Sequence, residues 1–134
     1  MTNNDKSKQQ TIQQKRAAKA WGQINAMQGK PDKEKKDYAS LVRGFAAMIQ
    51  TDGLAPALVF LEAKAKNNPS SPHYLLSQHL SEWVLAEMKA EKQQSLLRWV
   101  IHEDTNSTRY RQIATETIAY LIWLKRFVEA EGWT

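Results

Sequence analysis

Three histidines are the residues best suited to acid–base chemistry at neutral pH, because imidazole titrates there without a large pKa shift. They stand at positions 73, 79 and 102, so no two of them have the i, i+4 spacing that places two metal ligands on one helical face. His79 and Glu82 form a single pair and not the doubled motif of di-iron helical bundles. The sequence therefore predicts neither a catalytic histidine nor a metal site.

The other reactive residue types give the same result. Glu103 and Asp104 are adjacent in a polar run, where helix capping is their ordinary role. The chain has no cysteine, which excludes thiolate nucleophiles, cysteine metal sites and disulfides. All five glycines stand alone, so there is no phosphate-binding glycine loop, and no serine lies in a nucleophile-elbow motif. We expect a protein that is not an enzyme and that needs no cofactor.

Positive charge is the chemistry that the sequence does offer. The formal net charge of the 134 residues is +5. Residues 1–36 hold nine basic and three acidic side chains, a net charge of +6, whereas residues 37–134 hold ten basic and eleven acidic side chains, a net charge of −1. A basic segment beside a nearly neutral remainder is either a binding site for a polyanion or a solvated tail. Charge alone leaves both interpretations open.

Eight basic side chains are candidates for contacts with nucleic-acid phosphates, because Lys and Arg on helices bind phosphates without reading base sequence. Two lysines near the N-terminus share one helical stripe with an arginine at its edge, and another arginine interrupts an apolar run beside Gly44. Two further arginines begin a helix, where the macrodipole disfavours them. A solvated helix face remains the alternative for each. The candidates are Lys15, Arg16, Lys19, Arg43, Arg109, Arg111, Lys125 and Arg126.

Apolar residues at spacings of three and four predict the helices that must position these side chains. Glycine and proline fall between the periodic segments, and no alternating strand pattern, sustained heptad or internal repeat interrupts them. Gly53 and Leu54 predict a Schellman ending in which Leu54 packs on Ile49. The fold class is therefore all-α, a single compact bundle of about six helices in one domain of residues 8–134, with a disordered N-terminal tail at 1–7. The helices are expected at about 8–28, 33–51, from the turn at 53–56 to a stop before 67, from 71 to 88, 93–102 and 108–131.

Large aromatic side chains lie mostly on the apolar helix faces, where core packing is their expected role. These are Trp21, Phe45, Trp83, Trp99, Tyr120 and Trp123. Trp133 follows a glycine near the C-terminus and either folds back on the bundle or contacts a partner. Residues 118–124 are apolar on every face, which indicates either the central helix of the bundle or an interface.

The cellular location follows from composition. No stretch of about 18 consecutive apolar residues exists, so we expect no membrane-spanning segment. The polar N-terminus lacks the apolar core of a secretory signal, and the absence of cysteine fits a reducing cytosol. The sequence predicts a cytoplasmic protein.

Three blocks of sequence resemble the small helical subunit of type III-B CRISPR effector complexes. The first is residues 38–54 (YASLVRGFAAMIQTDGL) with residues 57–61 (ALVFL), the second is residues 80–83 (LSEW), and the third is residues 117–130 (TIAYLIWLKRFVEA). They follow one another in the order and at the spacing of that family, and the resemblance spans residues from about 15 to 131.

The resemblance implies an all-helical, non-catalytic subunit of a ribonucleoprotein that acts in antiviral RNA interference. Its implied partners are the backbone subunit, the large subunit, further copies of itself, and the guide and target RNAs. Basic faces of such subunits are expected to line the groove in which guide and target pair. The alternative is a free-standing helical DNA-binding regulator, which would need a helix–turn–helix with an exposed polar recognition helix.

Overall fold

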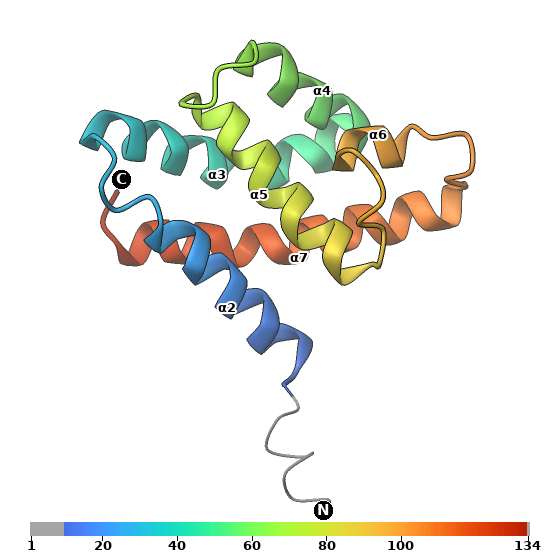
Figure 1. The fold of residues 1–134 in the computed structure, drawn as a ribbon, viewed down its shortest axis with the longest axis horizontal. Helices are drawn as coiled ribbons and strands as arrows, with labels where there is room; N and C mark the ends of the chain where they lie inside the picture. Colours follow the sequence, from blue (N-terminus) through green and yellow to red (C-terminus); the bar gives the residue numbers. More distant parts are fainter. Residues whose placement is uncertain (1–9, 134) are drawn as a thin grey trace, which may run out of the picture.

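The computed structural model describes residues 10–133, which form six α-helices, numbered as in Figure 1. The predicted all-α fold is confirmed, and this part of the chain contains no strand. The disordered tail that we expected at residues 1–7 lies outside the described residues. The helices are α2 (Ile12–Asn25), α3 (Asp32–Asp52), α4 (Leu54–Ala65), α5 (Pro72–Glu87), α6 (Leu96–Val100) and α7 (Ser107–Ala130). None of them is both long enough and apolar enough to cross a bilayer.

Helix α5 packs against all five other helices, whereas α7, the longest helix, packs against α2, α3 and α5 (Figure 1). Tyr120, Leu121 and Leu124 of the apolar α7 segment are buried, so this side of the segment belongs to the core, but α7 is not the central helix that we expected as one alternative. Ile122, on the outer side, is 52% exposed, so one face of the same segment remains in solvent. Trp133, just beyond α7, folds back into the core and is 6% exposed.

Side-chain caps fix where the helices begin, and they correct several predicted boundaries. Thr11 and Gln14 form a reciprocal capping box, so α2 begins at Ile12 and not near residue 8. Ser95 caps α6 by accepting from the Arg98 N–H, which shortens that helix relative to the predicted range of 93–102. Asp32 is the first helical residue of α3, where its negative charge interacts favourably with the helix N-terminus.

A single residue, Gly53, joins α3 to α4. Its N–H donates to the Ile49 carbonyl at 2.8 Å and its own carbonyl accepts from the Ala57 N–H at 3.2 Å. The dihedrals are φ +94° and ψ 159°, outside the left-handed helical region, so the predicted Schellman ending was wrong. Leu54 is instead the first residue of α4 and is buried. The Tyr110 hydroxyl of α7 accepts from the Ala55 N–H at 2.8 Å and so connects this corner to α7.

We expect Gly53→Ala to lower the free energy of unfolding by about 1–3 kcal/mol, because a side chain at this positive φ strains the backbone. A Cβ at this position would lie 3.6 Å from Pro56 Cδ, an ordinary contact, so the destabilisation would come from the backbone and not from a clash. The matched control is Gly44→Ala within α3, where a Cβ meets nothing within 4 Å. That substitution should stabilise the protein by about 0.5–1 kcal/mol. Urea unfolding followed by circular dichroism measures both, and equal effects would contradict the strain at Gly53.

Candidate nucleic-acid interface

A buried polar cluster joins the four longest helices. The Tyr38 hydroxyl of α3 lies 2.6 Å from His79 Nδ1 of α5. Gln23 Nε2 of α2 donates to the His79 carbonyl at 3.1 Å and to Glu82 Oε1 at 3.0 Å. The Tyr120 hydroxyl of α7 donates to Gln23 Oε1. The cluster therefore uses its polar atoms internally, and it accounts for the histidine in the leucine-rich part of α5.

His79 is neutral in this environment, because burial lowers its pKa to about 4, with a smaller opposing effect from Glu82. Burial also raises the pKa of Tyr38 and of Tyr120. A neutral imidazole held by a buried phenol has a structural role. It offers no proton donor of the strength that acid catalysis near neutral pH needs.

The buried His79 makes stability depend on pH. The unfolded chain binds a proton at His79 near pH 6.5, whereas the folded protein binds it only near pH 4. The free energy of unfolding should therefore fall as the pH drops from about 6.5 to about 4, by about 3 kcal/mol in total. Urea unfolding at pH 7.5 and pH 4.5 measures this decrease.

His79→Gln should remove this part of the pH dependence, and His102→Gln, which changes an exposed histidine, should leave it intact. Identical pH profiles for the wild type and His79→Gln would show that His79 is not the titrating group.

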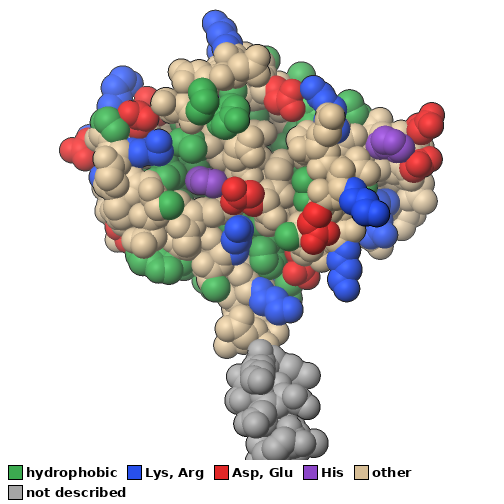
Figure 2. All heavy atoms as spheres, in the orientation of Figure 1, with side chains coloured by type: hydrophobic (Ala, Val, Ile, Leu, Met, Phe, Trp, Pro, Cys, Tyr) green, Lys and Arg blue, Asp and Glu red, His purple; other side chains and the backbone are tan. Residues whose placement is uncertain are grey.

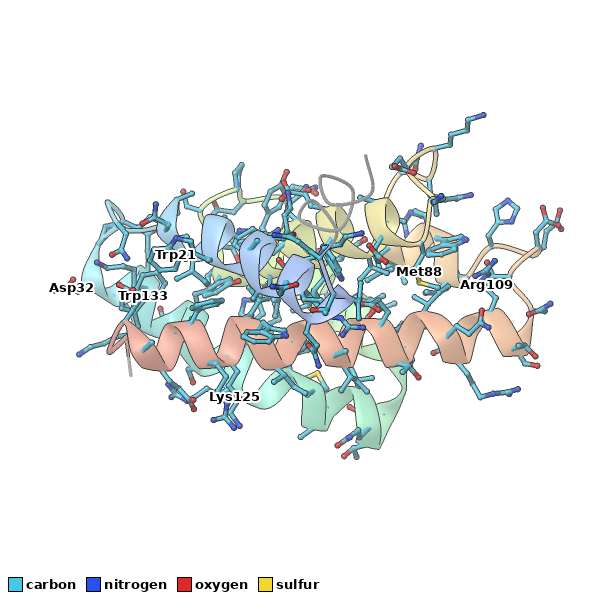
Figure 3. The ribbon with its side chains drawn as sticks, turned by 90° about the horizontal axis from the view of Figure 1, so that it is seen from below. Trp21, Asp32, Met88, Arg109, Lys125 and Trp133 are labelled. Carbon is cyan, nitrogen blue, oxygen red and sulfur yellow. The ribbon has the colours of Figure 1, made fainter. Side chains whose placement is uncertain are left out.

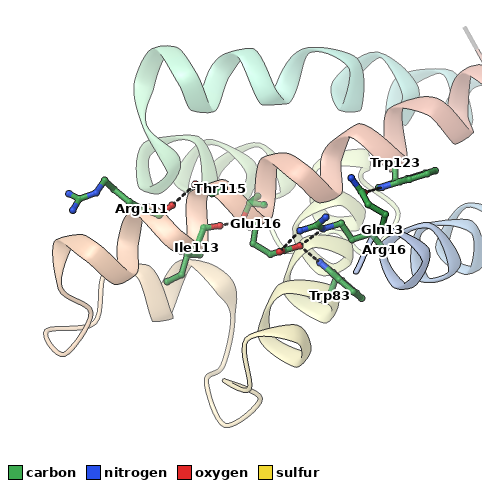
Figure 4. A network of polar contacts seen from close by, with 9 residues as sticks. Gln13, Arg16, Trp83, Arg111, Ile113, Thr115, Glu116 and Trp123 are labelled. Atoms are coloured by element: carbon green, nitrogen blue, oxygen red, sulfur yellow. Dashed lines mark hydrogen bonds and ion pairs between the residues drawn. The ribbon is translucent and has the colours of Figure 1, made fainter. Parts of the chain in front are cut away.

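An ion pair anchors α2 to α7 (Figure 4). Arg16 Nε and Nη2 donate to the two Glu116 carboxylate oxygens at 2.8 and 2.7 Å, and Trp83 Nε1 donates to Glu116 Oε2 at 2.8 Å. Burial alone would raise the pKa of Glu116, but these hydrogen bonds and the Arg16 charge hold that pKa below its ordinary value. The Arg16 side chain is only 12% exposed. Of the eight predicted phosphate-binding residues, Arg16 is thus the one whose charge is balanced inside the protein.

Arg16→Gln should lower the free energy of unfolding by about 2–4 kcal/mol, because it leaves a partly buried carboxylate without its counter-charge. Lys15→Gln is the matched control. Its side chain is exposed one position earlier, and its removal should cost less than about 0.5 kcal/mol. Thermal unfolding of both variants measures the difference. A second variant with both Arg16→Met and Glu116→Met should recover part of the stability, and equal stability of Arg16→Gln and Lys15→Gln would contradict the anchoring role.

The remaining α2 candidates stay on the surface but do not form a purely basic stripe. Lys15 is exposed. Lys19 Nζ lies 3.6 Å from Glu82 Oε1, with both side chains about half exposed (44% and 52%). An exposed pair at this distance is weak, but Glu82 reduces the positive potential around Lys19.

A more uniformly basic surface lies along the seam between α3 and α7, where the two helices run antiparallel. Near the start of α3, Lys35 Nζ lies 5.6 Å from the ring centroid of Trp133, which follows α7. Beyond the end of α3, at the α3–α4 junction, Ala55 is bonded to Tyr110 near the start of α7. Arg43 is about 80° around the helix from Lys35. Arg43 therefore lies at the edge of α3 that faces α7, opposite the middle of α7. Lys125 extends from α7 on the side where α3 lies (Figure 3).

Arg43 and Lys125, in the middle of this α3–α7 seam, have no acidic partner among the described residues. Residues 38–51 of α3 contain Arg43 and no acidic residue, and residues 117–128 of α7 contain Lys125 and Arg126 and no acidic residue. Arg126 Nη1 pairs with Glu129 Oε1 at 3.2 Å, at the end of the seam. Arg111 is exposed three to four turns before Lys125 on α7. Arg111 lines a hollow with Glu87 and Glu116, so Arg43 and Lys125 are the predicted cations in the seam and Arg126 lies at its end.

Arg43 carries an unsatisfied group in this seam. Its Nη1 is buried without a hydrogen-bond partner among the described residues, and its side chain is half-buried. A guanidinium nitrogen without a partner destabilises the isolated chain, because water cannot reach it and no protein acceptor replaces water. An anion bound beside Arg43 and Lys125 would supply negative charge where the protein provides none.

Arg109 lies apart from the other candidates, close to Met88 at the far end of the molecule (Figure 3). Its N–H is capped by Asn106 Oδ1 at 2.8 Å, and its Nη1 donates to Gln112 Oε1 at 3.2 Å. It lines a hollow of about 680 Å³ between the α5–α6 and α6–α7 loops. Arg109 and Arg111 were predicted together at one helix start, but the helix turns them to different sides.

The aromatic residues differ from expectation at one position. Trp83 is buried and stacks on Tyr120, with ring centroids 5.3 Å apart, as core packing predicts. Trp21, in contrast, is 42% exposed and lies against Phe127, with 5.7 Å between the centroids. The prediction that Trp21 belongs to the core was therefore wrong. Its position on α2 is one residue beyond Ala20, which is the position that packs inward.

A family model described as CRISPR-associated protein (Cas_Cmr5) matches residues 12–131. The match begins with α2 and ends one residue beyond α7, so it covers every helix described above. It includes both sides of the α3–α7 seam and the whole polar cluster.

Proposed function

The chain belongs to the CRISPR-associated Cmr5 family, the small subunits of type III-B complexes, and on this premise we propose that it is a non-catalytic RNA-contacting subunit of such a complex. It stacks along the cytoplasmic ribonucleoprotein, beside the backbone and large subunits, and supports antiviral RNA interference. It contacts the phosphates of guide or target RNA without reading their sequence.

The unsatisfied, acid-free α3–α7 seam is the observation that supports RNA contact. Arg43 and Lys125 are half-buried there, and neither forms an ion pair within residues 10–133. An RNA phosphate near them would supply negative charge where these two side chains have no acidic partner among the described residues. Arg126 lies one residue beyond Lys125 and pairs only weakly with Glu129 at the surface, so it adds positive charge at the end of the seam.

The proposal that the subunit is not catalytic is supported by how its reactive side chains are used. His79 is neutral and bonded to Tyr38, and Glu116 is bonded to Arg16 and Trp83. Among residues 10–133, no group of three or more His, Asp or Glu side chains is placed to hold a metal ion. No observation favours the DNA-binding alternative, because α4 follows α3 after one residue and most of its side chains are apolar.

RNA affinity and its salt dependence test this function. The double variant Arg43→Gln, Lys125→Gln should bind single-stranded RNA more weakly, to a similar extent for oligo-U and for a mixed sequence. Each phosphate that is no longer neutralised should reduce the slope of log K against log salt by about 0.7 for a single strand. The double variant should therefore lower that slope by about 1.4. Fluorescence anisotropy over a salt series measures both quantities.

The control is Lys64→Gln, Arg98→Gln, which removes the same charge from α4 and α6, away from the seam. If the seam and control variants weaken RNA binding equally, only the net charge matters and the seam has no special role. If neither variant changes the affinity or the slope, the RNA-contacting function is wrong.

A further inference from the structure

A groove between α2 and α5 faces solvent on the side of the molecule shown in Figure 2 and has a volume of about 380 Å³. Its α2 wall consists of small exposed residues, namely Ala18 and Gly22 of the helix and Ala26 at the C-cap. Lys19 and Lys30 of its rim face Glu82 of α5.

Nothing within residues 10–133 explains why residue 22 is a glycine. It lies inside α2, where glycine destabilises a helix relative to alanine. A Cβ built on it would meet no atom within 4 Å, and its φ is not positive. Neither close packing nor backbone conformation within residues 10–133 therefore requires it. What the missing Cβ does provide is a place where a group from another molecule can approach the α2 backbone.

The rim of the groove is positively charged. Lys15 is exposed on the same side of α2 as Lys19, about 40° away around the helix, and Lys30 follows the helix. Among the described residues, Lys15 and Lys30 form no ion pair, and Lys19 has only its 3.6 Å contact with Glu82. A group that fills the groove should therefore carry an apolar side chain next to negative charge.

The α6–α7 loop of the same chain presents such a group. Ile101, the residue that ends α6, is 56% exposed, and the exposed Glu103 and Asp104 follow it two and three residues later. Acidic side chains lie at this end of the molecule in Figure 2, whereas basic and acidic side chains are mixed around α2. Of the other large apolar side chains that are exposed in residues 10–133, Ile122 lies among cations and Trp21 packs on Phe127. Val59 shares a hollow with Glu62, but the Glu62 carboxylate already pairs with Arg98 at 3.4 Å.

We propose that the groove between α2 and α5 receives the α6–α7 loop of a second copy of this chain. Ile101 of one copy packs over Gly22 of the next, while Glu103 and Asp104 pair with Lys19 and Lys30. The two surfaces differ, so the contact is head-to-tail and each copy keeps one groove and one loop free for further copies. This assignment rests on the proposed function as a stacking subunit and names the surfaces that would stack. RNA is the competing occupant; its phosphates would offer negative charge to Lys19 and Lys30 but no aliphatic side chain to cover Gly22.

Two variants that each block one surface test this arrangement. Gly22→Gln fills the groove, and Ile101→Gln removes the apolar side chain from the loop. Sedimentation velocity up to millimolar protein should show concentration-dependent association of the wild type. Each variant alone should associate about tenfold more weakly, because the desolvated centre of the interface is disrupted. An equimolar mixture should form a one-to-one heterodimer that does not grow, since one intact groove and one intact loop remain.

Gly44→Gln is the matched control, because it makes the same change at an exposed glycine inside α3 where a Cβ also meets nothing within 4 Å. It should associate like the wild type. The charge variant Lys19→Glu, Lys30→Glu should fail to associate, and association should return when Glu103→Lys and Asp104→Lys are added to the same chain. The proposal is overturned if the wild type stays monomeric throughout, or if the mixture behaves like the separate variants.

The same variants separate this inference from the proposed function. RNA affinity should be unchanged in Gly22→Gln, because the α3–α7 seam is untouched. If Gly22→Gln instead lowers RNA affinity and leaves self-association intact, the groove binds RNA and the head-to-tail contact is wrong, while an RNA-contacting function stands.

Discussion

The contact between Tyr38 and His79 is the interaction on which the arrangement of the four long helices depends. A phenol and an imidazole are both buried at this point, and neither could remain there without a polar partner. Gln23 and Tyr120 extend the contact to α2 and α7, so one chain of hydrogen bonds fixes how all four helices meet. Apolar packing would tolerate small sliding of these helices, whereas a fully satisfied polar cluster specifies one register.

The distribution of charge follows from a second buried interaction. Glu116 is the only acidic residue in the middle of α7, from 112 to 128, and it points toward α2, where Arg16 and Trp83 bind it. Its charge is therefore removed from the opposite side of α7. The α3–α7 seam stays positive because the acidic residue that could have neutralised it serves the core. Stability and surface potential are coupled through this one side chain.

Much of the fold could be predicted from the sequence, because helical periodicity and punctuation are local signals. The all-α class and the six helices were confirmed in the described residues. Boundaries were less accurate, since Thr11, Ser95 and Gly53 act through specific hydrogen bonds and dihedrals that periodicity does not encode.

The site was harder to predict, because charge balance depends on pairs that lie far apart in the chain. Arg16 and Glu116 are separated by one hundred residues, so nothing local distinguishes Arg16 from its neighbour Lys15. Arg43, singled out by its apolar surroundings, does lie at a junction of two helices, and its unsatisfied nitrogen could be recognised only once the fold was known. The division of the basic residues between two sides of the molecule likewise required the phase of each helix.

The one-residue junction at Gly53 also restricts how chain length can vary in this family. Each residue added to a helix turns everything after it by about 100°. An insertion or deletion at the α3–α4 junction would therefore rotate the apolar side of α4 away from α5, and Tyr110 would no longer meet Ala55. The loop between α5 and α6, at residues 88–95, has no such restriction. Length differences between relatives should accumulate there, while the distance in sequence from Tyr38 to Leu61 should stay constant.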